Sequence, residues 1–475
     1  MSSPTHFDAI ILGAGSAGFA AARLLGSHGR KVAMVDKGPW GGLCILRGCM
    51  PTKTMLRTSD VVQLIRNSHE LGIEVGAPRV DFPAVMARKD RLVKGFQDYR
   101  LEGLQRAPNA TMIEGAARFV GPHSIEVAGQ RYTADRFLIS TGSTPSVPPV
   151  PGLREVGYIT SDEAMRLTAL PESMAVWGGG VIALELGQFY ARLGVKVTLI
   201  LRSKTVLSRE DADVQQTMEA CLVEDGLTIV KQTRVERVER HGDAKRLVGY
   251  SGDQPFSLDV AEILVATGRK PLIEPLDLEA AGVAAPGGAI AVDATMRTSN
   301  PAIYAAGDCL GDYFLVHVAI QQAEVAAHNM LGRSPTREAD YRLLASAIFT
   351  DPQFARVGLS EREAAEMGQE VLVGRYDFAD LGKAECMGKG AMRGFVKILA
   401  DPATGEILGA QVLGPEGSDL IHELIVAMEF RCTVERFLTI PHLHPTLAEI
   451  LTYPAEEIAE ARAERGLAVL EAFGG

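Results

Sequence analysis

The chain has 475 residues, 47% hydrophobic and 23% charged, which is the composition of a folded protein with room for about three domains. Its net charge of −11 argues against nucleic acid and anionic membranes as partners, because both attract an excess of Lys and Arg. Six cysteines are too few for a disulfide scaffold. The N-terminus lacks a targeting signal and the apolar run at 9–22 is too short to span a membrane, so we expect a cytoplasmic protein.

The first predicted unit is a β-α-β module. Residues 7–12 form a continuous apolar run typical of a buried parallel strand, a helix is predicted through Leu25, and residues 31–36 form a second strand. Between the first strand and the helix lie three glycines in a G-x-G-x-x-G arrangement, Gly13, Gly15 and Gly18. They allow a tight turn and the approach of a pyrophosphate, while Asp36 is placed to bind a ribose 2′-hydroxyl. We therefore predict a dinucleotide site.

The next segment, 41–53, contains two cysteines, Cys44 and Cys49. On an ideal helix five residues rise about 7.5 Å and the two side chains diverge, whereas a disulfide needs Cα atoms within roughly 7 Å. The segment must therefore be irregular if the pair closes, and glycines permit this: Gly41, Gly42 and Gly48. No second cysteine pair has metal-ligand spacing, so we predict no metal site, while two unpaired thiols remain an alternative.

A second module of the same kind begins near residue 174, after a proline-rich boundary at Pro145, Pro148, Pro149 and Pro151. The strand at 174–177 leads into a G-x-G-x-x-A turn made by Gly178, Gly180 and Ala183. A helix follows at 181–193, and a strand follows at 195–201. Two such modules predict two nucleotide-binding domains.

The strand of the second module ends at Leu201, where an NAD site would have an acid for the ribose 2′-hydroxyl. Two cations follow, Arg202 and Lys204, and a 2′-phosphate attracts cations. They could also be ordinary surface charges after a strand. We favour NADPH over NADH.

The C-terminal part has a different character. Pro271 and Pro275 mark a second boundary, and from about Ala345 onward the pattern changes. Residues 395–399 and 406–413 predict antiparallel strands around a turn, followed by helices.

Together the first glycine triplet, the C-x4-C segment ending at Lys53 and the second module resemble the flavoprotein disulfide reductases, which include dihydrolipoamide dehydrogenase, glutathione reductase and mercuric reductase. Residues 298–308 resemble the family's second FAD motif, and residues 442–449 resemble its C-terminal His–Glu pair. The resemblance covers essentially the whole chain in the family's order. It departs at Leu43 and Leu46, where the family usually has Thr and Asn.

The resemblance implies an α/β fold with two Rossmann-like domains and a C-terminal α+β dimerisation domain. We expect a discontinuous FAD-binding domain at 1–148 and 273–344, interrupted by an NAD(P)-binding domain at 149–272. The dimerisation domain then covers 345–475, and the protein is expected to be a homodimer.

The resemblance also implies roles for individual residues. The cofactor-binding residues assigned to FAD beyond the first module are Lys53, Thr141, Gly142 and Asp308, whose carboxylate contacts the ribityl chain in the family. Gly268 is assigned to NAD(P), together with the second glycine turn and the cations that follow it. Glu185 is expected to pair with Lys53 near the flavin.

His444 and Glu449 are expected to be an acid–base pair. A thiolate leaving group needs a proton, histidine titrates near neutrality, and a carboxylate on the second ring nitrogen fixes the tautomer. In the family this histidine reaches the cysteine pair of the other subunit. His442, by contrast, is expected to be structural.

These expectations combine into an FAD-dependent disulfide or dithiol oxidoreductase. Hydride passes from NAD(P)H through FAD to Cys44–Cys49, and Cys44 attacks a substrate disulfide, such as a lipoyl group, or the reaction runs in reverse. The His-Pro-Thr-Leu-x-Glu segment at 444–449 looks most like dihydrolipoamide dehydrogenase. Glutathione reductase-like activity is an alternative. Mercuric reductase-like activity is a weaker one, because no cysteine pair lies near the C-terminus, no metal-binding domain precedes Phe7 and His444 is present. A non-catalytic flavoprotein subunit is a remote alternative.

Overall fold

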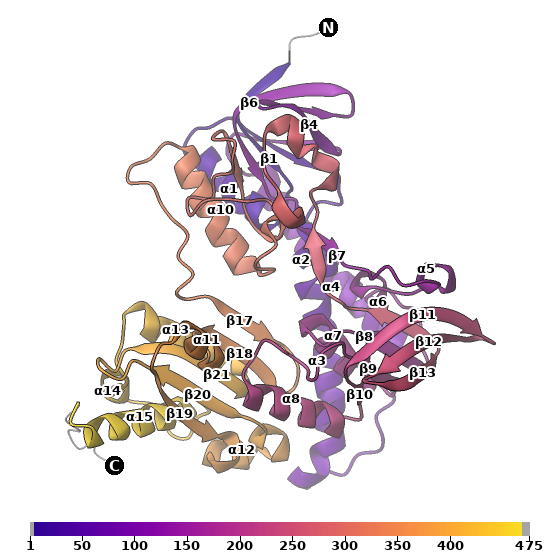
Figure 1. Cartoon of the computed structure of the whole chain (residues 1–475), viewed down its shortest axis with the longest axis vertical. Coiled ribbons are helices and arrows are strands. Elements are labelled where there is room, and N and C mark those ends of the chain that lie inside the picture. Colours follow the sequence, from indigo (N-terminus) through magenta and orange to yellow (C-terminus); the bar gives the residue numbers. More distant parts are fainter. Residues whose placement is uncertain (1–3, 468–475) are drawn as a thin grey trace.

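The computed structural model describes residues 4–467 and contains three main sheets, each with its own helices (Figure 1). The first module lies at the top of Figure 1, the second module at the lower right and the C-terminal region at the lower left. The α/β class and the arrangement of two Rossmann-like units with a C-terminal α+β unit are confirmed. The exact boundaries at 148, 272 and 344 stay predictions. Among the described residues, no helix combines the length and apolar character needed to cross a membrane.

The sheet of the first module has the order β3-β2-β1-β6-β5-β4, with β16 also paired to β6. Its strands are β1 (Thr5–Leu12), β2 (Val32–Asp36), β3 (Ala110–Glu114), β4 (Ala117–Gly121), β5 (Ser124–Val127), β6 (Gln130–Ile139) and β16 (Ile303–Ala305). Strand β16 arrives from far along the chain and pairs in parallel with β6, so this sheet is built from two separate segments. Helices α1 (Ser16–Ser27) and α10 (Val316–Met330) pack together beside it (Figure 1).

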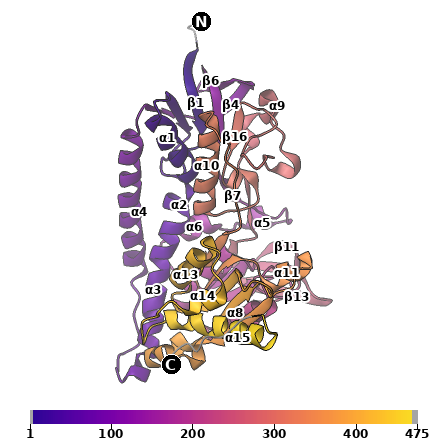
Figure 2. The ribbon, with the colours of Figure 1, turned by 90° about the vertical axis from the view of Figure 1, so that its left-hand side faces the viewer.

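Three helices connect β2 to β3, namely α2 (Gly42–Arg47), α3 (Cys49–Asn67) and α4 (Phe82–Gln105). Figure 2 shows α4 along one edge of the molecule and α3 descending toward the C-terminal region. Met55 and Leu56 of α3 belong to the same buried core as Leu184 of α7 (Val181–Arg192) and Phe354 of β18 (Gln353–Gly358). The helix that begins at Cys49 is therefore packed against both of the other units.

The second module is a four-stranded parallel sheet in the order β10-β9-β8-β14. Its strands are β8 (Ser173–Trp177), β9 (Lys196–Ile200), β10 (Thr228–Val230) and β14 (Glu262–Val265). Helix α8 (Ala212–Glu224) and an antiparallel sheet complete it, with strands β11 (Thr233–His241), β12 (Ala244–Ser251) and β13 (Gln254–Val260). Its short helices are α5 (Leu153–Val156) and α6 (Ser161–Ala164).

The chain enters and leaves the second module through two strands that pair with each other. Strand β7 (Ser143–Pro145) is antiparallel to β15 (Arg269–Pro271). After β15 the chain returns to the first module through the short helix α9 (Leu278–Ala281).

The C-terminal region is an antiparallel sheet in the order β17-β18-β21-β20-β19, as expected for the predicted strand pair. Its remaining strands are β17 (Ala345–Ile348), β19 (Leu372–Asp377), β20 (Phe395–Ala400) and β21 (Ile407–Gly414). Its helices are α11 (Glu361–Met367), α12 (Gly382–Met387), α13 (Gly417–Glu429), α14 (Val434–Leu438) and α15 (Thr452–Glu464).

Candidate active site

The first glycine turn leaves one side open for a ligand. Gly13 has φ +104°, and a Cβ atom there would lie 2.3 Å from the Ser140 carbonyl oxygen. A Cβ on Gly18 would lie 2.0 Å from the Gly13 oxygen, whereas one on Gly15 would meet nothing closer than 4.0 Å. The first and third glycines are thus required by packing, and the second presents free backbone, as a pyrophosphate site needs.

Asp36 lies at the end of β2 against this turn. Its Oδ2 accepts a hydrogen bond from the Ala14 N–H at 2.8 Å, and its Oδ1 accepts one from the Gly38 N–H at 2.8 Å. The carboxylate therefore orders the turn, and its contact with a ribose stays a prediction.

The second predicted FAD motif lies near the carboxyl end of the same sheet. The Ser143 hydroxyl donates to Asp308 Oδ2 at 2.5 Å, and Arg269 Nε donates to the Ser143 oxygen at 2.8 Å. Burial raises the pKa of Asp308, although Ser143 and Arg269 oppose the shift. Thr141 has a buried hydroxyl without a hydrogen-bond partner in the described chain, and Gly142 beside it has φ +72°. An unpartnered buried hydroxyl next to an acid and an open glycine turn fits a bound FAD.

The second glycine turn repeats the first. Gly178 has φ +145°, and its Cβ would lie 2.2 Å from the Ala266 carbonyl oxygen, while a Cβ on Gly180 would meet nothing within 4 Å. Ala183 is buried in the helix that follows. Gly268, with φ +121°, is also open. These features fit a second dinucleotide.

Leu201 is fully buried, and its Cδ2 lies 2.6 Å from where a Cβ on Gly179 would stand. The position of the expected acid is therefore filled by an apolar contact. Arg202 and Lys204 are exposed and form no ion pair with any residue that the structure describes.

The cysteine segment is irregular, as its spacing predicts. Helix α2 ends at Arg47, Gly48 has φ −138° and ψ −116°, and α3 begins at Cys49. This break brings the Cys44 and Cys49 thiols close enough for each to shift the pKa of the other. Both cysteines are thiols here and are partly buried.

The two thiols titrate as a pair. The hydrogen bond from Cys44 and the positive charge of Lys53 lower the pKa of Cys49 to about 7, against the opposing effect of burial. The same hydrogen bond and burial raise the pKa of Cys44. The first proton therefore leaves Cys49, at the N-terminus of α3, where the helix dipole also favours a thiolate.

Lys53 and Glu185 form the expected ion pair, with Lys53 Nζ 2.8 Å from Glu185 Oε2 and 2.9 Å from Oε1. Glu185 Oε1 also accepts a hydrogen bond from the Phe349 N–H at 3.0 Å, and Lys53 Nζ lies 4.4 Å from the centre of the Phe349 ring. Phe349 was not predicted. Nothing in its local sequence indicates that it contacts an ion pair whose two residues belong to the first and second modules.

His444 Nδ1 lies 2.8 Å from Glu449 Oε1, and Glu449 Oε2 accepts from the Thr446 N–H at 2.8 Å. Burial acts to raise the pKa of Glu449, but these hydrogen bonds outweigh it and the pKa is lowered. The His444 side chain is 82% exposed. His442 instead is largely buried and bonds Glu423 at 2.7 Å, in line with a structural role.

His444 does not lie beside the cysteines of its own chain. It falls between α14 and α15, which Figure 1 places far from α2. The residues whose charges act most on Cys44 are Cys49 and Arg100.

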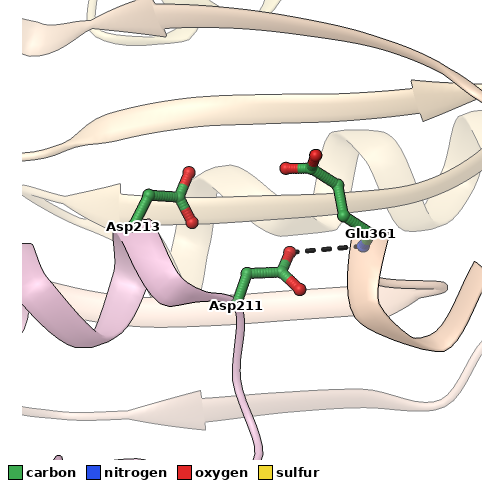
Figure 3. Close-up of side chains that lie close together, drawn as sticks. All are labelled: Asp211, Asp213 and Glu361. Carbon is green, nitrogen blue, oxygen red and sulfur yellow. Dashed lines mark hydrogen bonds between the residues drawn. The ribbon is translucent and has the colours of Figure 1, made fainter. Parts of the chain in front are cut away.

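An acidic cluster outside this site has a structural explanation. Asp211 and Asp213 come from the start of α8, and Glu361 comes from α11 (Figure 3). Lys397 Nζ lies among them, 2.9 Å from Asp211, 3.0 Å from Asp213 and 2.6 Å from Glu361, with its side chain 1% exposed. The ammonium group occupies the position a cation would take, so the cluster joins the second module to the C-terminal sheet.

Arg269 and Ser143 are further site residues that the sequence did not reveal. A Gly-Arg pair after a strand and a serine near prolines are too common to be diagnostic. Their position beside Asp308 depends on the pairing of β7 with β15, which is a tertiary feature.

Comparison with known proteins agrees with this arrangement. Residues 7–323 match the profile described as pyridine nucleotide-disulphide oxidoreductase, and residues 344–455 match the dimerisation domain of that family. A mercuric reductase from Lysinibacillus sphaericus is 34% identical over 449 residues, covering 94% of this chain and 80% of that protein. A dihydrolipoyl dehydrogenase from Chlamydia trachomatis is 35% identical over 450 residues, covering 94% and 95%.

Among solved structures, the HOCl-induced flavoprotein disulfide reductase RclA from Escherichia coli superposes with a TM-score of 0.85 at 28% identity, covering 94% of this chain and 99% of that one. The glycine turns, the cysteine segment and the C-terminal sheet thus lie within regions of the chain that match known proteins. The chain belongs to the pyridine nucleotide-disulphide oxidoreductases, FAD-dependent flavoprotein enzymes that use a pyridine nucleotide and carry a dimerisation domain.

Proposed function

We propose that the protein is an NADPH-dependent disulfide reductase whose redox centre is Cys44–Cys49. The observation that carries the proposal is the meeting of these two thiols at the break between α2 and α3, beside the Lys53–Glu185 pair. Bound FAD would accept hydride from the nicotinamide and deliver two electrons to the cysteine disulfide. Lys53 would then hold the Cys49 thiolate by its charge.

In the reductive direction the residues act in sequence. His444 from the other subunit of a homodimer accepts the Cys44 proton at Nε2, because Nδ1 is held by Glu449. The Cys44 thiolate attacks one sulfur of the substrate, the substrate S–S bond breaks, and the leaving thiolate takes the proton from His444. The Cys49 thiolate then attacks Cys44 Sγ, which releases the second substrate thiolate and re-forms the cysteine disulfide. Run in reverse, the same steps oxidise a dithiol such as dihydrolipoamide.

The proposed preference for NADPH rests on the residues that follow strand β9 in the second module. Leu201 is buried and offers no acceptor to a ribose 2′-hydroxyl, while Arg202 and Lys204 are exposed cations without a carboxylate partner in the described chain. The 2′-phosphate of NADPH would supply a negatively charged partner for these two cations.

The test uses a variant in which the sulfur atom of Cys49 is replaced by oxygen. Cys49→Ser should retain FAD but lose reduction of lipoamide and glutathione disulfide by at least about 1,000-fold, because the mixed disulfide cannot be resolved. Cys386→Ser is the matched control, since Cys386 is exposed and lies outside the site. Undiminished disulfide turnover in Cys49→Ser would contradict the proposed mechanism and favour a flavoprotein whose cysteines are not used.

A second candidate, mercuric ion reduction, is favoured by the 34% identity to mercuric reductases. Two thiols that meet at one helix start could hold a soft metal ion. NADPH oxidation measured with mercuric ion and, separately, with each disulfide distinguishes the two. Turnover with mercuric ion alone would select this candidate instead.

A further inference from the structure

Arg47 is the one charged residue between the two cysteines in the sequence, and its partner lies in the second module. It is the last residue of α2, and its Nη1 donates a hydrogen bond to Asp162 Oδ2 at 3.1 Å. Asp162 belongs to the short helix α6, and its side chain is largely buried. This ion pair therefore joins the redox segment of the first module directly to the second module.

The segment 161–165, which contains α6, meets all three helices that connect β2 to β3. From α3, the Thr52 hydroxyl oxygen lies 3.3 Å from the Met165 sulfur. From α4, the buried Lys89 side chain donates a hydrogen bond through Nζ to the Met165 carbonyl oxygen at 2.7 Å. Arg47 supplies the contact from α2. One short segment of the second module is thus a common point of attachment for the helices around the cysteines.

This segment is itself held firmly inside the second module. Just before it, the Ile159 N–H donates a hydrogen bond to the Ile263 carbonyl oxygen of β14 at 2.9 Å. Within it, the Ala164 carbonyl oxygen accepts a hydrogen bond from the buried Tyr190 hydroxyl of α7 at 2.6 Å. Because these bonds fix the segment to β14 and to α7, Asp162 is a fixed anchor for a group that reaches it from another module.

Helix α2 has few anchors of its own. It is six residues long, too short to be stable alone, and Ile45 is its one buried residue. Glycines flank it at both ends: Gly41 has φ +132°, and Gly48 has φ −138° and ψ −116°. Glycine allows backbone rotation that other residues restrict, so α2 can turn relative to α3 unless a side chain holds it. Arg47 is the side chain that does so.

Stability alone does not explain the contact. Arg47 Nε and Asp162 Oδ1 are buried and have no hydrogen-bond partner among the described residues. The two groups therefore make one of the two hydrogen bonds that an arginine–carboxylate pair can form. Buried polar atoms without partners oppose the free energy that the ion pair gains. The position that the contact gives to α2 accounts for it better.

We propose that Arg47 is a positioning residue of the redox centre, which holds α2 through Asp162 so that the Cys44 thiol stays close to Cys49. The inference rests on the proposed function and adds the contact between modules that sets how readily the pair closes. When both thiols are held in place, less entropy is lost as the S–S bond forms, so the contact favours the disulfide. Arg47 is not among the charges that act most on either thiol, so its effect is one of position.

The first test is a redox titration that does not depend on turnover. The full-length holoenzyme is equilibrated with oxidised and reduced dithiothreitol, so that each cysteine pair that closes converts one oxidised dithiothreitol into its dithiol. Free thiols are alkylated, and the state of Cys44 and Cys49 is measured by peptide mass. Arg47→Met and Asp162→Ala should each lower the equilibrium constant for disulfide formation roughly tenfold, which raises the potential by about 30 mV.

The controls separate this contact from a general loss of stability. The double variant Arg47→Met, Asp162→Ala should match each single variant, because both substitutions remove the same contact. Arg47→Lys should keep most of the wild-type constant. Arg118→Met is the matched control, since Arg118 pairs with Glu126 at 2.8 Å within the first module, and this variant should leave the constant unchanged.

The second test is the pH dependence of iodoacetamide alkylation at Cys49. Cys44 is the largest cause of the lowered pKa of Cys49, so a Cys44 thiol that moves away should raise that pKa. Arg47→Met should therefore shift the alkylation profile of Cys49 to higher pH, and Arg47→Lys should leave it close to the wild-type profile.

An equilibrium constant unchanged by Arg47→Met would overturn the inference while leaving disulfide reduction in place. A change in Arg47→Met without one in Asp162→Ala would also overturn it, because Arg47 would then not act through Asp162. A wild-type pair that formed no disulfide would instead contradict the proposed function, and the alkylation profile of Cys49 would still decide whether Arg47 holds the two thiols together.

Discussion

The two glycine turns make the same backbone hydrogen bond to the neighbouring strand. They differ in the side chain of the residue that follows the accepting carbonyl group. In the first, the Gly13 N–H donates to the Val35 carbonyl oxygen at 2.8 Å, and in the second, the Gly178 N–H donates to the Ile200 oxygen at 3.0 Å. The next residue is Asp36 in one module and Leu201 in the other.

The difference lies in what that next residue does to the turn. Asp36 accepts a hydrogen bond from the Ala14 N–H, whereas Leu201 is buried against Gly179. Both side chains hold the turn in place, one by a polar bond and one by packing. The backbone required for a pyrophosphate can therefore be kept while the chemistry offered to the ribose changes.

The largest expected effect comes from adding one methyl group to the first glycine of each turn. Gly13→Ala forces a Cβ onto the Ser140 carbonyl oxygen, so we expect a protein purified without flavin and with lower stability. Gly178→Ala forces a Cβ onto Ala266, so we expect flavin to be retained and its reduction by NADPH to be lost. Flavin absorbance and rapid-mixing reduction measure the two outcomes.

Gly95→Ala is the control for these substitutions, because a Cβ there meets nothing within 4 Å. If Gly178→Ala lost its flavin while Gly13→Ala kept it, the assignment of the two turns would have to be exchanged.

A smaller effect is expected at the two cations that follow strand β9 in the second module. The double variant Arg202→Gln, Lys204→Gln should raise KM for NADPH by roughly 10–100-fold and leave KM for NADH nearly unchanged, because only NADPH carries the 2′-phosphate. Steady-state kinetics with both coenzymes test this. Lys196→Gln is the matched control, since Lys196 lies at the other end of β9 and pairs with Glu172. A wild-type preference for NADH would show that Leu201 had been misinterpreted.

The smallest effect is expected at the contact between the modules, where Lys53 of α3 meets Glu185 of α7. The hydrogen bond from Cys44 and, after it, the charge of Lys53 lower the pKa of Cys49 to about 7. Lys53→Met removes the second of these causes, so that pKa should rise. A rise of about one would lower the thiolate fraction near pH 7 by roughly fivefold. The pH dependence of iodoacetamide alkylation of the reduced protein measures it, and an unchanged profile would show that Lys53 does not hold the thiolate.

Local signals explain why much of the site could be predicted. The strands that precede each glycine turn, the acid at Asp36 and the break at Gly48 all follow from short stretches of sequence whose physical requirements are local. The Lys53–Glu185 pair and the His444–Glu449 pair were expected from the family resemblance, and the distances within each pair are those of hydrogen bonds.

Other features required long-range contacts that no local pattern encodes. Ser143 and Arg269 meet Asp308 only because β7 pairs with β15. Lys397 of β20 pairs with carboxylates from the start of α8 and from α11, and Phe349 supports Glu185 from a third unit.

The pairing of β7 with β15 has a consequence for how such a protein can be altered by recombination. Because the strand leading into the second module lies directly against the strand leading out of it, the chain enters and leaves this module at one place. A foreign module with the same two strands could be inserted without moving the flavin half, provided that it presents a surface to α3 like that of α7. The replacement module would also have to supply the carboxylates that Glu185 offers to Lys53 and that Asp211 offers to Lys397.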